Sequence, residues 1–301
     1  MPSASELFEE WDADNILFLE ETIWTSSIQQ SDLSKARMLL LNNGFKHVDL
    51  CIVRPNNEDF GRVKWKYHYD LKGNCVSTNY QTKIEVHSNH LKLIVGLIDK
   101  NDNQECQNTT LSVISTLRVI FGIPIARELV FVNSYTKGNP TCTTSSEEGF
   151  TSYFLTQTLN MFPNIENAKV KIIPVEACIL LDKAFQQKYP IECFVLMWTA
   201  FESIIHSLDI PGNTNGLKRK NYFTNELKSE LVNDEAYRLH QDVRCNIFKE
   251  AKFTSAKDVE DENFSLYAIL QLTIMEDCPE RSKFLKSYEE ILKTKKALAQ
   301  N

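Results

Sequence analysis

An arginine and a lysine five residues apart form the most suggestive chemical pattern in this sequence. The segment 239–249 carries His240, Arg244, Asn246 and Lys249. A guanidinium group can stabilise charge on a phosphate, and an imidazole can accept and return a proton near neutral pH. His240 precedes Arg244 by four residues, so the two share one face of a helix. These four residues are the candidate catalytic group.

The same residues also have an ordinary structural interpretation. In the last turns of a helix, Arg244 and Lys249 would interact with the terminal carbonyl groups and the helix dipole. His240 would then be a half-exposed helix residue. Their spacing alone leaves both interpretations open.

Glu202 and His206 lie four residues apart in the helix expected over 191–208. They form either an ordinary intrahelical pair or a supporting set of groups that faces the helix of Arg244.

A basic run offers a separate candidate for contact with RNA. Lys218, Arg219 and Lys220 precede Tyr222 and Phe223, and cations beside aromatic rings suit a phosphate backbone and its bases. The alternative is a solvated loop between two helices.

Other common chemistries lack support in the sequence. His87 and His90 have the spacing of metal ligands, but no third ligand lies nearby, so we expect no metal. The chain contains no G-x-G-x-x-G, G-x-x-x-x-G-K-[ST], H-E-x-x-H or G-x-S-x-G motif. The sequence therefore gives no support for a dinucleotide-binding, P-loop, zincin or esterase protein, and no cofactor is expected.

Helical periodicity dominates the second half of the chain. The clearest case follows Pro190, where one face carries Ile191, Phe194, Val195, Trp198, Phe201, Ile205 and Leu208. Similar spacing predicts helices near 110–122, 146–161, 174–188, 222–231, 234–249, 262–276 and 280–298. We therefore predict an all-α bundle.

In the first half of the chain, apolar residues recur every two positions. Alternation such as Val63, Trp65, Tyr67 and Tyr69 predicts an antiparallel meander of about four strands over 47–98. A short helix is expected before it, beginning at Ser31-Asp-Leu-Ser34 and ending at Asn42-Asn43-Gly44. The first 30 residues have no clean period and are expected to be an entry segment.

The polar stretch 99–108 is the predicted domain boundary. The prediction is an α+β recognition region with a small antiparallel sheet over 1–105 and a mainly helical domain over 106–301. A strand-like run at 129–132 falls within the second part.

Two segments of the helical half resemble Apea-like HEPN domains. The stretch 194–205 is similar to the family helix in which a tryptophan and a glutamate, here Trp198 and Glu202, accompany an apolar stripe. The stretch 239–253 resembles the signature helix, an arginine followed after four residues by a histidine. Arg244 fills the arginine position, and Lys249 stands where the histidine is expected.

The resemblance implies a metal-independent endoribonuclease that works as a homodimer. The family histidines manage the proton of the attacking 2′-hydroxyl, and the arginines stabilise the phosphate charge. A histidine has an unperturbed pKa of about 6.5 and a lysine one of about 10.4. Lys249 would need a pKa lowered by about 3 to 4 units to act as a base, so the motif is degenerate at this position.

Composition limits where the protein works. The 301 residues are 43% hydrophobic and 24% charged, and the net charge is −7. We expect a soluble cytoplasmic protein with reduced cysteines and no membrane segment. On an acidic chain, any RNA surface must be a local basic patch.

Three functions remain open. The leading one is an RNA-directed HEPN-like protein of a toxin or antiviral defence system, which binds RNA and has a protein trigger or regulator. The second is an inactive pseudoenzyme that keeps the dimer surface as an interaction module. The third is a binding protein whose ligand site lies on the sheet.

Overall fold

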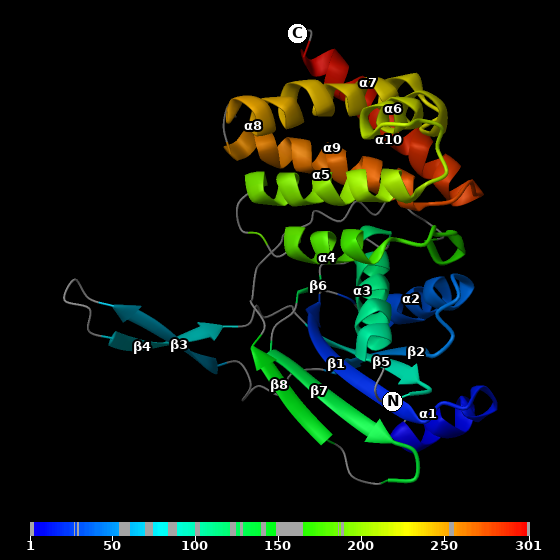
Figure 1. Cartoon of the computed structure of the whole chain (residues 1–301), viewed down its shortest axis with the longest axis vertical. Coiled ribbons are helices and arrows are strands. Elements are labelled where there is room, and N and C mark those ends of the chain that lie inside the picture. Colours follow the sequence, from blue (N-terminus) through cyan, green and yellow to red (C-terminus); the bar gives the residue numbers. More distant parts are fainter. Residues whose placement is uncertain are drawn as a thin grey trace.

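The computed structural model describes residues 3–26, 28, 30–53, 61–69, 75–83, 89–99, 103–120, 125–126, 129–139, 143–148, 165–185, 187, 190–252 and 256–299. Figure 1 shows a sheet with helices packed on it in the lower half and a bundle of helices in the upper half. The predicted combination of an antiparallel sheet and a helical second half is therefore confirmed.

The main sheet is antiparallel, with the strand order β2-β5-β1-β7-β8. Its strands are β1 (Phe18–Ser26), β2 (Val48–Val53), β5 (Asn89–Leu97), β7 (Leu129–Thr136) and β8 (Thr143–Glu148), and the short β6 (Ile125–Ala126) also pairs with β1.

Strand β1 corrects the expectation that the first 30 residues only enter the fold. It pairs with β5 on one side and β7 on the other, so it is the central strand. Glu21 interrupts its apolar pattern but is buried, and its carboxylate pairs with Lys92 Nζ at 2.8 Å. A buried ion pair of this kind hides a strand from any search for alternating apolar residues.

Strand pairing also crosses the predicted boundary near residue 105. Because β7 and β8 complete the sheet that β1 and β5 begin, the sheet part extends to Glu148. The helix expected over 146–161 is wrong at its start, since residues 146–148 belong to β8. Its remainder lies outside the described residues.

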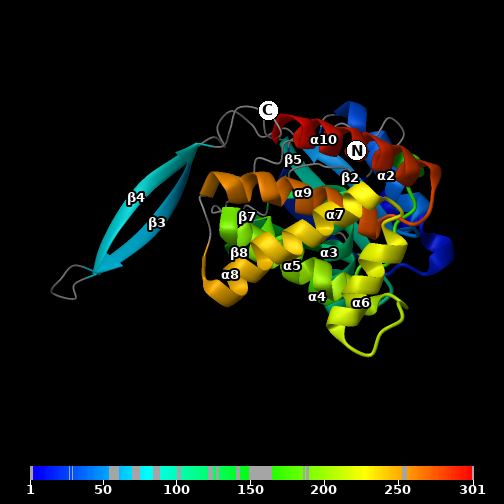
Figure 2. The same cartoon turned by 90° about the horizontal axis from the view of Figure 1, so that it is seen from above.

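The predicted four-strand meander over 47–98 divides into two sheets. Strands β2 and β5 pair directly in the main sheet. Between them in sequence, β3 (Gly61–Tyr69) and β4 (Cys75–Lys83) pair only with each other in a separate two-stranded sheet. This ribbon projects from the body in both views (Figures 1 and 2).

Helices cover both faces of the main sheet. Helix α1 (Ala4–Glu10) packs with Leu19 and Ile94 on one face, where Gly96 lets the Trp11 ring approach closely. Helices α2 (Gln30–Asn42) and α3 (Asn103–Val119) pack on the other face. The predicted stop of α2 is confirmed, since Gly44 adopts a φ of +90° just beyond it.

The second half is a helical bundle with an aromatic core. Its regular helices are α4 (Val175–Ala184), α5 (Pro190–Ser207), α6 (Asn215–Asn221), α7 (Glu230–Arg238), α8 (Cys245–Glu250), α9 (Ala256–Ile274) and α10 (Pro279–Ala299). Two wider π-helical segments follow α6 and α7, namely η4 (Tyr222–Glu226) and η5 (Leu239–Arg244). The largest buried side chains of the bundle include Trp198, Phe201, Tyr222, Phe284 and Tyr288.

Buried polar contacts join the sheet part to the bundle. Arg118 at the end of α3 pairs with Asp182 of α4 at 2.5 Å, and both side chains are almost completely buried. The Asn43 amide donates to Ala168 O at 2.9 Å and accepts from Val170 N at 2.8 Å. These contacts fix the bundle on the sheet part, because each would leave a buried polar group unsatisfied if the two parts separated.

Two further expectations concern a membrane-spanning helix and the state of the cysteines. Among the described residues, no helix is long and apolar enough to span a membrane. The described cysteines Cys51, Cys106, Cys178, Cys193, Cys245 and Cys278 are all free thiols.

Candidate functional site

Helix α5 provides the carboxylate around which the site is built. Trp198 is buried in the bundle, and its indole Nε1–H donates to Glu202 Oε1 at 3.0 Å. The Trp198 ring also packs against Phe194 and Phe201. Glu202 is therefore a carboxylate beside an apolar core, and such a group requires cationic partners.

Arg219 of α6 is the nearer of two such partners. Its guanidinium pairs with Glu202 Oε1 at 2.5 Å. Thr214 caps the start of α6, and Lys218 Nζ donates to the backbone carbonyl of His206 at 3.3 Å, which ties α6 to α5. The basic run is thus part of a helix rather than a solvated loop, and the three cations have different surroundings.

Arg244, the last residue of η5, is the second cationic partner of the Glu202 carboxylate. Its guanidinium lies 3.9 Å from Glu202 Oε1 and stacks on the Phe248 ring at 5.0 Å. Among the described residues, no group accepts a hydrogen bond from its buried Nε–H. The side chains of Glu202, Arg219 and Arg244 are 21%, 17% and 23% exposed, so solvent and a ligand can reach them.

A π-helical segment carries His240 and Arg244. Segment η5 joins α7 to α8, and the Cys245 N–H bonds to His240 O, five residues back instead of four. Each residue added to a helical turn rotates everything downstream by about 100° relative to an unbroken α-helix. Segments of this kind occur frequently at functional sites.

His240 lies beside Trp198, with the ring centroids 5.9 Å apart. Its Nε2 is buried and has no hydrogen-bond partner in the described part of the chain. Burial, followed by the positive charges of Arg219 and Arg244, lowers the pKa of His240 to about 4. The imidazole is therefore neutral at pH 7.

We call Glu202, Arg219, His240 and Arg244 the open arginine cluster. Two guanidinium groups share a single carboxylate and the histidine is neutral, so the cluster has an excess positive charge. This arrangement suits an anion with several oxygen acceptors, such as a phosphate.

The other predicted site residues lie at its margin. Lys249 is exposed in the last turn of α8, although its charge also helps to lower the pKa of His240. Asn246 is exposed and donates its side-chain amide to the backbone carbonyl of Asp242. Lys220 is exposed on α6. The structure thus brings together Glu202, Arg219, His240 and Arg244, and Glu202 pairs with the arginines instead of His206.

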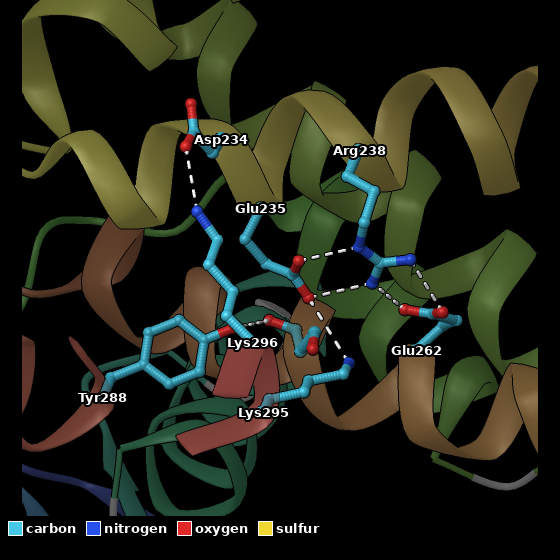
Figure 3. A network of polar contacts seen from close by, with 8 residues as sticks. Asp234, Glu235, Arg238, Glu262, Tyr288, Lys295 and Lys296 are labelled. Atoms are coloured by element: carbon cyan, nitrogen blue, oxygen red, sulfur yellow. Dashed lines mark hydrogen bonds and ion pairs between the residues drawn. The ribbon is translucent and has the colours of Figure 1, made fainter. Parts of the chain in front are cut away.

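A second cluster lies on the same long helix, and Figure 3 shows it closely. Arg238 donates to both oxygens of Glu235 at 2.7 and 2.9 Å and to Glu262 Oε1 at 2.8 Å, while Lys295 Nζ lies 3.7 Å from Glu235. Burial raises the pKa of Glu235, but its bonds to Arg238 outweigh this and lower it overall. We call Glu235, Arg238, Glu262 and Lys295 the closed arginine cluster, because two cations meet two carboxylates.

The sequence pattern places Arg219 in a separate basic run, whereas the structure places it at the carboxylate of Glu202. A usable signal existed, namely a glutamate on an otherwise apolar helix, which implies a buried cationic partner. Which cation fills that role depends on how α6 packs, and local sequence does not report that.

Comparisons with known proteins add no assignment. The chain matches no family model, no curated protein and no solved structure. Within the described residues, no group of three or more His, Cys, Asp or Glu side chains is arranged to hold a metal ion.

Proposed function

We propose that this chain is a HEPN-like protein that acts on RNA and binds an RNA phosphate at the open arginine cluster. The observation that carries the proposal is that Arg219 and Arg244 share the single carboxylate of Glu202 and that all three charges act on the neighbouring His240. A phosphodiester supplies the negative charge and the acceptor oxygens that this set of groups lacks.

The same groups support a metal-independent cleavage step. The 2′-oxygen of a ribose attacks the adjacent phosphorus, its proton passes to His240, and the bond from phosphorus to the 5′-oxygen breaks. The products are a 2′,3′-cyclic phosphate and a 5′-hydroxyl, whose oxygen takes the proton from His240 and so returns the imidazole to its neutral form. Arg219 and Arg244 stabilise the negative charge on the phosphate oxygens during this step.

The charge of a bound phosphate would act on His240. Burial is the main cause of its low pKa, and a phosphate would offset the two arginine charges that add to it, so binding would raise the pKa of His240. By linkage, phosphate binding should tighten as the pH falls toward 4. His240 thereby takes the proton-carrying role that the resemblance assigns to the position of Lys249.

The resemblance to HEPN proteins supplies the wider context of the proposal. It implies a homodimer within a toxin or antiviral defence system, with the sheet part recognising a trigger. The second candidate function is an inactive pseudoenzyme in the same context. The exposure of Lys249, and the weak basicity of an imidazole with a pKa near 4, favour that alternative.

Cleavage assays in EDTA separate the two candidates. Wild type, Arg244→Ala, His240→Gln and Lys249→His proteins are incubated with total RNA, with Lys286→Ala on the exposed face of α10 as a control for lost charge. Cleavage to 2′,3′-cyclic ends by the wild type and the control, lost in Arg244→Ala and His240→Gln, supports the ribonuclease. Cleavage only by Lys249→His supports the pseudoenzyme. If no protein cleaves and Arg244→Ala binds RNA as tightly as the wild type, the proposal fails.

A further inference from the structure

The β3–β4 ribbon is basic on an acidic protein. Its strands contain Arg62, Lys64, Lys66 and Lys83 and no aspartate or glutamate. Counted with the sequence that joins and flanks the strands, residues 54–85 contain six Lys or Arg and four Asp or Glu, whereas the whole chain has a net charge of −7. A local excess of positive charge on an acidic chain attracts polyanions to that part of the molecule.

Charge and aromatic character alternate along β3. Successive residues of a strand belong to opposite faces, so positions 62, 64, 66 and 68 share one face. That face has three cations and a histidine, and Tyr80 of β4 is the register partner of Lys64. The other face has Trp65, Tyr67 and Tyr69 at successive positions. The sequence pattern thus gives the ribbon one cationic face and one aromatic face.

The ribbon is a sheet of its own. Strands β3 and β4 pair with each other over their full lengths and with no other described strand. Figures 1 and 2 show the ribbon extending away from both the sheet and the bundle. An isolated two-stranded ribbon is only marginally stable in water, so a ligand that covers it would stabilise it.

We propose that the β3–β4 ribbon is an arm that binds single-stranded RNA, with the phosphates along the cationic face and the bases turned around the edge of the narrow ribbon to stack at the aromatic positions of the other face. This inference rests on the proposed function in that it names the form of RNA and a second place where it binds. Single-stranded RNA fits better than a duplex, because unpaired bases can stack on aromatic rings and the major groove of A-form RNA is too narrow to be read.

The test uses the full chain and a fluorescein-labelled oligouridine, with affinity measured by anisotropy from about 50 mM to about 200 mM salt. The test variant is Arg62→Ser/Lys64→Ser/Lys66→Ser. The matched control is Lys183→Ser/Lys286→Ser/Lys293→Ser, which removes three exposed cations from α4 and α10. Circular dichroism and the melting temperature check that both variants fold.

We expect the ribbon variant to lose about tenfold or more in affinity, and the slope of log affinity against log salt to fall by up to about 2, since each phosphate contact contributes about 0.7. The control should change neither quantity appreciably. Trp65→Ala should lose about tenfold with an unchanged salt slope, because it removes stacking rather than charge.

The results for the ribbon and for the open arginine cluster can be told apart. If the ribbon variant binds like the control while Arg244→Ala loses affinity, the ribbon inference is wrong and the proposed function stands. If the ribbon variant loses affinity while Arg244→Ala does not, the ribbon binds RNA and the proposed site does not. Equal binding of a duplex RNA, with no effect of Trp65→Ala, would overturn the preference for single strands.

Discussion

Arg238 and Arg244 belong to one long helix but have opposite surroundings. Arg238 donates to two carboxylates, Glu235 and Glu262, in the closed arginine cluster (Figure 3). Arg244 has a single carboxylate at 3.9 Å, shared with Arg219, and an Nε–H with no acceptor in the described part of the chain. The closed cluster is balanced in charge, and the open cluster is not.

The difference in charge balance indicates a stabilising role for the closed cluster and a functional role for the open cluster. In the closed cluster, ion pairs hold α7 against α9 and α10, and Arg238 makes four hydrogen bonds to two carboxylates. In the open cluster, two guanidinium groups share one carboxylate beside a neutral histidine. Uncompensated charge costs stability, and a folded protein commonly tolerates that cost at a functional site.

Breaking the closed cluster should have the largest effect on stability. Arg238→Ala leaves Glu235 buried without its main partner, and the free energy of unfolding should fall by about 3 kcal/mol. Lys296→Ala, which removes an exposed pair with Asp234, is the control and should cost less than about 1 kcal/mol. Chemical denaturation measures both, and equal losses would contradict the distinction between the clusters.

Removing the carboxylate of the open cluster should lower stability by a smaller amount and should raise RNA affinity. Glu202→Gln keeps an acceptor for Trp198 but leaves Arg219 and Arg244 uncompensated, so stability should fall by about 1 to 2 kcal/mol. RNA affinity should rise several-fold, because two freed guanidinium groups then face the phosphate. Denaturation and anisotropy measure the two quantities, and a parallel fall in both would argue against a phosphate site.

The pH dependence of stability should contain a contribution from His240. Its pKa is about 4 in the folded chain and about 6.5 when unfolded, so between these values the unfolded state binds more protons. The contribution is complete above pH 6.5 and is lost as the pH falls toward 4. Solvent screening of this partly exposed group keeps it modest.

Unfolding free energies of wild type and His240→Gln, measured across this range, isolate the contribution. The difference between the two proteins should change with pH between about 6.5 and about 4 and be constant above that range. A constant difference throughout would show that the imidazole is not held neutral by its neighbours.

The smallest expected effect concerns the end of the helix that carries Arg244. Ala251 adopts a left-handed φ of +50°, and Lys252 N–H bonds back to Asn246 O at 3.1 Å. Ala251→Gly relieves the strain of a side chain in this conformation and should stabilise the protein by up to about 1 kcal/mol. Thermal unfolding measures it, and a lower melting temperature would show that Ala251 has a packing role.

The sequence predicted the elements of the bundle better than their arrangement. The apolar stripe from Phe194 to Ile205 placed Trp198 and Glu202 correctly on one helix, because α-helical periodicity is a local signal. The sequence did not predict the π-helical segment η5 between α7 and α8, because π-helical hydrogen bonding has no comparable signature in the sequence. The sequence placed Arg244 and Lys249 in one candidate group, and the structure pairs Arg244 with Glu202 and leaves Lys249 exposed.

The sheet was harder to predict for a related reason. The pairing of β1 with β7 joins residues more than a hundred positions apart, and no local pattern encodes it. Buried charges also obscured the strand, as Glu21 shows with its partner Lys92. The site was hard to predict for the same reason, because Arg219 and Glu202 come together only through tertiary packing.

The most direct test of the open arginine cluster compares the RNA affinity of Arg244→Ala with that of the control Lys286→Ala. Anisotropy with the same oligouridine measures the affinity of each variant, and an unfolding curve measures its stability. The account predicts that Arg244→Ala loses about tenfold in affinity or more and little stability, while the control keeps both. Unchanged affinity in Arg244→Ala, with the fold intact, would contradict the claim that this cluster binds RNA phosphate.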